Sequence, residues 1–135
     1  MRYKHTRGFS LVELIIVVAI VGILSSVALG FFGDNVIASN RSEGRAALSE
    51  AAGSLEKCKS LYGAYNAGNC NVAAAIVSDT NLYTIDTTSA RTATTFTLTA
   101  TPVAGQPQVN DTDCTTMTLT NTGVKGGTPA TNECW

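Results

Sequence analysis

Histidine is almost absent from this chain of 135 residues: the single histidine is His5, which precedes the first long apolar segment. The rest of the chain therefore lacks the side chain that most often serves as a general acid or base, or as a zinc ligand. A phosphate-binding glycine loop of the Walker type is also missing. Asp111 and Asp113 are two acids in one expected loop, a pattern typical of a solvated surface. We expect no enzymatic activity, no metal site and no cofactor.

Charge is scarce as well, at 14% of residues. The first eight residues carry three bases and no acid: Arg2, Lys4 and Arg7. The remainder has six basic and ten acidic residues, a net charge of −4. A nucleic-acid-binding surface needs a concentration of positive charge, and this composition does not supply one as a whole. Basic residues ahead of an apolar segment follow the positive-inside pattern, which predicts a cytoplasmic N-terminus.

A long apolar run extends from Phe9 to Phe32, and Glu13 is its only charged residue. As a helix of about 24 residues it would be about 36 Å long, enough to cross a bilayer. A cleaved secretory signal is the competing interpretation, but its apolar part is shorter and ends at a small-residue cleavage site. Because a lone carboxylate is costly in lipid, we expect Glu13 to pair with a group on another molecule.

Small residues recur every four positions within this run, at Gly22, Ser26 and Gly30. That spacing places them on one helical face, where a second helix can approach closely. Simple tolerance of glycine and serine in membrane helices explains the stripe equally well. Together with Glu13, the stripe favours assembly between helices.

The segment Arg7-Gly8-Phe9-Ser10-Leu11-Val12-Glu13-Leu14 resembles the prepilin signature of type IV pilins and related pseudopilins. The resemblance implies that a prepilin peptidase cuts between Gly8 and Phe9, and that Phe9 is then N-methylated. It also implies that Glu13 pairs with the N-terminal amine of a neighbouring pilin subunit. The precursor would sit in the inner membrane with its head in the periplasm, and assembly machinery would move it into an extracellular pilus.

The next segment is expected to be an amphipathic helix that ends near residue 62, with Asp34 or Asn35 capping its start. Its apolar stripe is predicted to lie on a sheet, and comprises Val36, Ile37, Ala47, Leu48, Ala51, Ala52, Leu55 and Leu61. Its charged residues are predicted to form a solvated face: Arg41, Glu43, Arg45, Glu50, Glu56 and Lys57. Residues 63–69 have the glycine and asparagine content of a loop, and the predicted loop extends to residue 80.

All four cysteines follow the apolar run, and none is in C-x-x-C spacing. An even number in a small domain predicts two disulfides and an oxidising compartment. Three connectivities are possible. We favour Cys58–Cys70 with Cys114–Cys134, because each bond then ties neighbouring segments.

Threonine alternates with apolar residues in residues 95–101 and 116–120, which predicts two strands with one buried face each. Residues 82–85 are a further short strand candidate, Asn121-Thr122-Gly123 is a turn, and residues 125–132 are an expected loop. The expected fold is α+β: a long N-terminal helix packed on an antiparallel sheet of three or four strands. The predicted organisation is a leader (1–8), a transmembrane or fibre-core helix (9–33) and a head (34–135), whose sheet and disulfide-closed tail occupy 81–135.

The head further resembles PilE-type minor pilins, in segments that cover most of it outside residues 58–80: Val36–Gly44, Tyr83, Thr97–Pro102, Asp113-Cys114, Leu119, Gly123 and Cys134-Trp135. The resemblance implies a minor pilin needed for pilus assembly, adhesion or twitching motility, with other pilin subunits as partners. The alternatives are a major pilin, or a DNA-uptake pilin that binds DNA through its head. Lys57, Lys59, Arg91 and Lys125 are available for DNA, but the acidic balance disfavours it.

Overall fold

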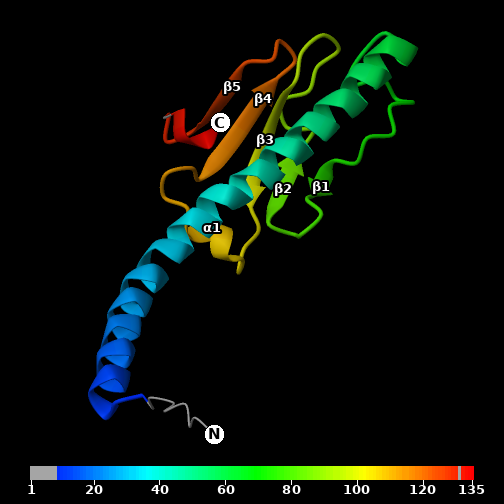
Figure 1. Ribbon diagram of the computed structural model, residues 1–135. Helices are drawn as coiled ribbons and strands as arrows, with labels where there is room; N and C mark the ends of the chain where they lie inside the picture. The colour runs from blue at the N-terminus through cyan, green and yellow to red at the C-terminus, as the bar shows by residue number, and fades with distance from the viewer. Residues whose placement is uncertain (1–8, 131) are drawn as a thin grey trace, which may run out of the picture. The chain divides into compact units, whose positions relative to one another are not determined.

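The computed structural model describes residues 9–130 and 132–135, and consists of one long helix, a five-stranded sheet and two short 3₁₀ helices (Figure 1). The helix α1 runs from Leu11 to Tyr62. Contacts divide the chain into two compact units, with the boundary after Asn35. We call residues 9–35 the N-terminal unit and residues 36–135 the globular unit, and describe each by itself.

The N-terminal unit is the first part of α1. Its apolar side chains between residues 11 and 27 are all exposed. Among the described residues, no helix combines the length and the hydropathy that crossing a bilayer requires. The predicted role of residues 9–33 in a membrane or fibre core stays a prediction. The expected cap at Asp34 or Asn35 was wrong: both residues are helical, because an unbroken α1 leaves no free N–H groups there for a side chain to cap.

The globular unit contains an antiparallel sheet whose strands follow the chain in order, β1-β2-β3-β4-β5 (Figure 1). The strands are β1 (Ala75–Val77), β2 (Tyr83–Asp86), β3 (Thr97–Pro102), β4 (Thr116–Thr120) and β5 (Lys125–Thr128). The 3₁₀ helices are η1 (Pro107–Asn110) and η2 (Asn132–Cys134). This meander needs no crossover connection, since each strand pairs with the next one along the chain.

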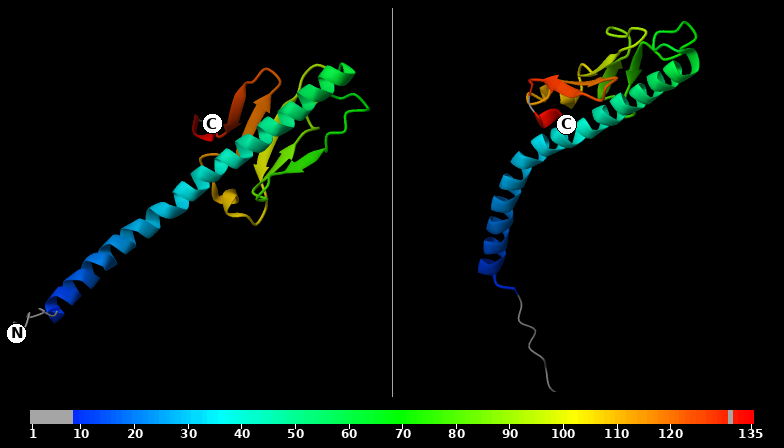
Figure 2. Two further views of the ribbon diagram at one scale, coloured as in Figure 1. Left: turned by 45° about the vertical axis from the view of Figure 1, so that its right-hand side comes forward. Right: turned by 90° about the horizontal axis from the view of Figure 1, so that it is seen from above.

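The second half of α1 lies across one face of the sheet (Figure 2). Its buried side chains recur at helical spacing: Ala47, Leu48, Ala51 and Leu55. They share one core cluster with the alternate residues of the strands, Tyr83, Ile85, Leu98, Ala100, Met117 and Leu119. Gly44 lets the helix approach closely, because a Cβ there would meet Met117 Cε and the ring of Tyr83. The α+β architecture predicted from the sequence is confirmed.

Two strands differ from the sequence prediction. β1 lies inside the expected loop 63–80, and β5 lies inside the expected loop 125–132. β5 contains Gly126 and Gly127, which weaken a strand intrinsically. Gly127 is nevertheless required, because a Cβ there would meet the Cys134 side chain and lie 2.8 Å from the Thr116 carbonyl oxygen. Pairing with β4 and the nearby disulfide therefore outweigh local propensity.

Candidate functional site

The start of α1 carries the residues expected to act in processing and assembly. Gly8 lies outside the described residues, and Phe9 is exposed just before the helix. Glu13 is in the first turn, where its backbone N–H donates to Ser10 Oγ over 3.2 Å. Ser10-Leu11-Val12-Glu13 thus has the sequence of a capping box, with serine at N-cap and glutamate at N3. An acid in the first turn also stabilises the helix dipole, so Glu13 has a local role that the sequence reasoning missed.

The small-residue stripe lies on α1. Ser26 Oγ donates to the Ile23 carbonyl over 2.8 Å, which satisfies the hydroxyl within its own helix. A Cβ built on Gly22 would meet no atom within 4 Å, so the backbone there is open to an approaching helix. Gly30 is also helical, but its surroundings lie outside the described residues. The assembly role of Gly22, Ser26 and Gly30 stays a prediction.

A buried ion pair fixes the C-terminal tail of the globular unit to α1. The Arg41 guanidinium donates to both carboxylate oxygens of Asp111, over 2.7 and 2.6 Å, and to the Glu133 carbonyl over 2.8 Å. Asp111 also accepts from Gln108 Nε2 and from the Cys114 N–H, each over 3.0 Å. Burial pushes the pKa of Asp111 up, but the Arg41 hydrogen bonds and charge outweigh it and lower the pKa. The prediction that Arg41 lies on a solvated face was wrong, because its partner is distant in sequence.

Two disulfides form in the structure, Cys58–Cys70 and Cys114–Cys134, the pairing favoured from the sequence. The first ties the end of α1 to the following loop. The second ties the tail to the segment before β4, next to the carbonyl of Cys134 that accepts from Arg45 over 3.0 Å. Both bonds therefore hold irregular backbone close to the helix.

Tyr65 organises the loop that the Cys58–Cys70 bond closes. Its buried ring makes an edge-to-face contact with Phe96, at a centroid distance of 4.8 Å. Its hydroxyl donates to Glu56 over 2.7 Å, and this hydrogen bond, together with burial, raises the pKa of Tyr65 to about 12. Lys59 Nζ lies 4.4 Å from the ring centroid, a cation–π distance. The loop is thus packed firmly against the end of α1.

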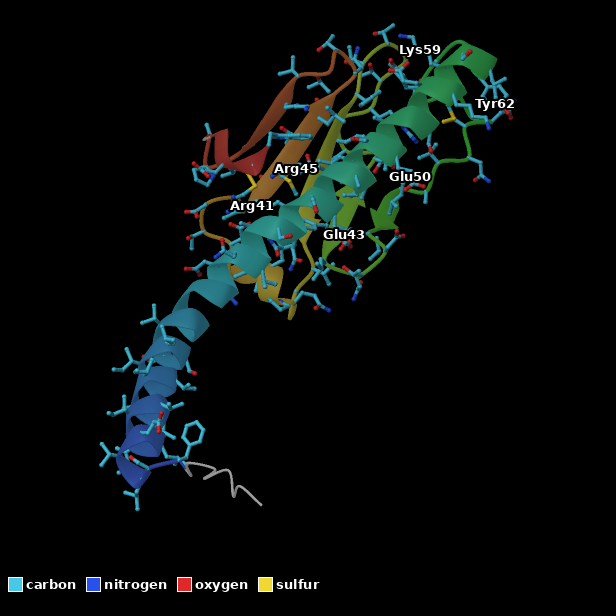
Figure 3. The ribbon with its side chains drawn as sticks, viewed as in Figure 1. Arg41, Glu43, Arg45, Glu50, Lys59 and Tyr62 are labelled. Carbon is cyan, nitrogen blue, oxygen red and sulfur yellow. A yellow bond between two sulfur atoms is a disulfide. The ribbon has the colours of Figure 1, made fainter. Side chains whose placement is uncertain are left out.

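A surface groove with a volume of about 370 Å³ lies between the last turns of α1 and the chain around Cys70. We call it the helix-end groove; it is lined by Ser54, Lys57, Cys58, Leu61, Tyr62, Asn69, Asn71 and Val72. Leu61 and Tyr62 are 63% and 47% exposed, although Leu61 was predicted to be part of the buried stripe. Figure 3 shows Lys59 and Tyr62 near the end of α1. The groove therefore offers one ammonium, one aromatic ring and two side-chain amides to a ligand.

The other basic residues considered from the sequence lie elsewhere on the globular unit. Arg91 forms an isolated bridge with Phe96, beside Tyr65. Lys125 lies on β5, with its Nζ 4.9 Å from the centroid of the Trp135 ring. Neither lines the helix-end groove. Sequence reasoning named Lys57 but missed Tyr62, Asn69 and Asn71 as binding residues. Tyr62 is the last residue of α1, and the Cys58–Cys70 disulfide brings Asn69 and Asn71 close to it.

Among the described residues, no group of three or more histidine, cysteine or acidic side chains is arranged to hold a metal ion. The helix-end groove contains none of the paired acid and base groups that hydrolytic or transfer chemistry requires. Its cation, ring and amides are suited to binding.

Comparison with known proteins finds two family matches. The family described as type IV minor pilin ComP, DNA uptake sequence receptor, matches residues 31–118. The prokaryotic N-terminal methylation motif matches residues 3–29. A search of curated proteins finds no match to the chain. The ComP match covers most of the globular unit, including the helix-end groove, β1 to β3 and the first part of β4.

Proposed function

The chain belongs to the family of type IV minor pilins, and from this premise we propose that its globular unit binds DNA at the helix-end groove. As a minor pilin the chain is a structural subunit of the type IV pilus, and other pilins are its partners. Its matched family is described as a receptor for DNA uptake sequence. This description is contrary to the sequence-based judgement that DNA is a disfavoured ligand. Net charge averages over the whole surface, whereas binding depends on the local groove.

The residue types in the groove support this proposal. Lys57 supplies a positive charge for phosphate, and phosphate contacts dominate affinity for DNA. Tyr62 presents an exposed ring on which a base can stack, and Asn69 and Asn71 carry amides of the kind that read base edges. Lysines near the end of α1 also favour the helix dipole, so their charge alone does not distinguish binding from capping. The exposed Tyr62 is the observation that carries the proposal, since a helix end has no structural need for it.

The test uses the full chain in detergent and a short double-stranded DNA, with binding measured by fluorescence anisotropy over a range of salt concentrations. Replacing Lys57 with alanine should weaken binding and reduce the salt slope by about 1, the contribution of one phosphate contact. Replacing Tyr62 with alanine should weaken binding and leave the salt slope unchanged. Lys125→Ala is the matched control and should bind like the unaltered chain. Unchanged binding by both groove variants, or loss confined to the Lys125 variant, would reject the site.

We also propose that the prepilin peptidase cuts between Gly8 and Phe9, that Phe9 is methylated, and that Glu13 pairs with the N-terminal amine of a neighbouring subunit. The match to the methylation motif over residues 3–29 supports this. A pilin is made as a membrane-anchored precursor and ends in the pilus. We propose that the N-terminus of this precursor lies in the cytoplasm and its globular unit in the periplasm. Inner-membrane machinery then extracts the subunit into the pilus. We propose no catalytic role.

Glu13→Ala should leave membrane insertion intact and prevent incorporation into pili, as measured by immunoblots of sheared filaments. Because Glu13 also belongs to a capping box, Ser10→Ala is the matched control: it removes the cap acceptor and keeps the charge. Equal incorporation of the Glu13 variant and the unaltered chain would contradict the pairing, and loss in the Ser10 variant alone would assign the defect to capping. Mass spectrometry of the mature chain tests the cleavage site and the methyl group.

A further inference from the structure

The two edges of the sheet differ in their protection. At the β5 edge, the Trp135 indole N–H donates to the Gly126 carbonyl over 2.7 Å, so the tail covers backbone that would otherwise be open. At the other edge, β1 is the terminal strand, and Ala75 and Val77 are both exposed. An unprotected edge strand is a template for another strand, and proteins normally cover or disrupt such edges.

The register shows which backbone groups of β1 face outward. The Ser78 N–H donates to the Tyr83 carbonyl, and the Thr87 N–H donates to the Ala74 carbonyl, which marks two hydrogen-bonded pairs of the β1–β2 ladder. Such pairs alternate with non-bonded pairs in an antiparallel ladder. The N–H and C=O groups of Ile76 therefore face β2. The N–H and C=O groups of Ala75 and Val77 face away from the sheet. No hydrogen bond to these groups occurs among residues 9–130 and 132–135.

A small groove of about 70 Å³ runs between α1 and β1, and we call it the edge groove. It is lined by Glu43, Ala46, Ala47, Glu50, Ile76, Val77, Ser78 and Asp79. Three of these residues are acidic and none is basic. In Figure 3, Glu43 and Glu50 lie on the side of α1 toward β1 and β2, whereas Arg41 and Arg45 lie on the side toward β4 and β5.

Hydrogen bonds hold one acid of the edge groove, Glu43, in place. Glu43 accepts hydrogen bonds from the N–H and hydroxyl of Thr80, in the turn after β1. Burial raises the pKa of Glu43, but its hydrogen bonds to Ser78 and Thr80 outweigh this and lower it, so the carboxylate is charged at neutral pH. The lining of the edge groove is therefore negative, which favours a positively charged ligand.

We propose that the β1 edge binds an extended, lysine- or arginine-bearing segment of another protein, which adds as a sixth strand. The outward groups of Ala75 and Val77 would hydrogen-bond to its backbone, and the acids of the edge groove would pair with its basic side chains. Because successive residues of a strand point to opposite faces of the sheet, the residues between the basic ones would contact the exposed side chains of Ala75 and Val77. The proposal goes beyond DNA binding, because the ligand is a positively charged protein segment and it binds at the edge groove instead of the helix-end groove.

The test measures binding of two end-blocked peptides to the full chain in detergent: one alternates lysine with valine, and the other alternates glutamate with valine. The lysine peptide should bind saturably, at least about tenfold tighter than the glutamate peptide. Hydrogen exchange should slow at the amides of Ala75 and Val77 when the lysine peptide is bound. Proline is tolerated where an edge N–H faces outward, so Val77→Pro should remove one donor and leave the pairing with β2.

Val77→Pro should weaken binding of the lysine peptide about tenfold, while Val77→Ala, which keeps the N–H, should have a smaller effect. Glu50→Lys should also weaken it, and Glu133→Gln, an exposed acid outside the edge groove, is the charge control. Absence of binding, equal binding of both peptides, or binding that Val77→Pro and Glu50→Lys leave unchanged would each overturn the proposal. If the chain self-associates and Val77→Pro abolishes this self-association, the β1 edge binds a second copy of the chain, and the proposal of a different protein is overturned.

Discussion

Removing the Asp111 carboxylate should be among the most damaging single changes to the globular unit. The Arg41 and Asp111 side chains are only 7% and 1% exposed, and the guanidinium and carboxylate form a two-point hydrogen bond. Asp111→Ala would leave a buried charge without its partner. Losses of this kind cost about 3–5 kcal/mol. A domain of this size has a free energy of unfolding of about 5–15 kcal/mol, so the variant would lose a large fraction of its stability.

The double variant Arg41→Met with Asp111→Ala separates the charge effect from the lost hydrogen bonds. Removing both partners leaves no unpaired charge, so the two single costs should not add. The Cys114 N–H and the Glu133 carbonyl still lose a partner, at about 1–3 kcal/mol each. The double variant should therefore be no less stable than Asp111→Ala alone.

The assay is chemical denaturation of the full chain with both disulfides intact. Trp135 is the only tryptophan, so its fluorescence reports on the tail that Arg41 holds. Asp113→Asn is the control: this acid is 3.7 Å from Arg41, but its side chain is 73% exposed, and such pairs contribute about 0–1 kcal/mol. A cost below about 1 kcal/mol for Asp111→Ala, or strict additivity of the single variants, would refute the reasoning.

Three further changes test other parts of the globular unit in the same assay. Gly44→Leu should cost about 1–3 kcal/mol by overpacking the interface of helix and sheet, whereas Gly53→Leu, where a Cβ meets nothing within 4 Å, should cost little. Hydrogen bonds from Ser89 and Thr88 lower the pKa of Asp86 to about 2 from 3.8. Its contribution to the free energy of unfolding is therefore complete above pH 4 and is lost as the pH falls toward 2. Asp86→Asn should flatten this part of the plot of stability against pH, and an unchanged slope would contradict the assignment. Replacing Cys58 and Cys70 with serine opens a loop with a sequence separation of 12 and should lower the free energy of unfolding by about 3 kcal/mol. An unchanged denaturation midpoint would show that packing alone holds the loop.

Local periodicity was enough to predict most of the regular structure. Alternation of threonine with apolar residues located β3 and β4, because the side-chain period of a strand is visible without knowing its partners. Helical spacing of Ala47, Leu48, Ala51 and Leu55 identified the buried face of α1 for the same reason. The processing motif was also readable, since its residues are contiguous and the match to the methylation motif covers them.

The binding surfaces depend on residues that come together only in the folded unit. The sequence predicted that Arg41 lies on a solvated face. In the structure Arg41 is buried and pairs with Asp111, which is distant in sequence. β1 has only three residues and β5 contains two glycines, so neither has a clear strand pattern in the sequence, and each is stabilised by pairing with a neighbouring strand. The sequence alone determined the helix, the two threonine-rich strands and the family. Tertiary structure decided which charges are buried, which sheet edge is open and which side chains share a groove, because contact energies between distant segments leave no periodic trace in the chain.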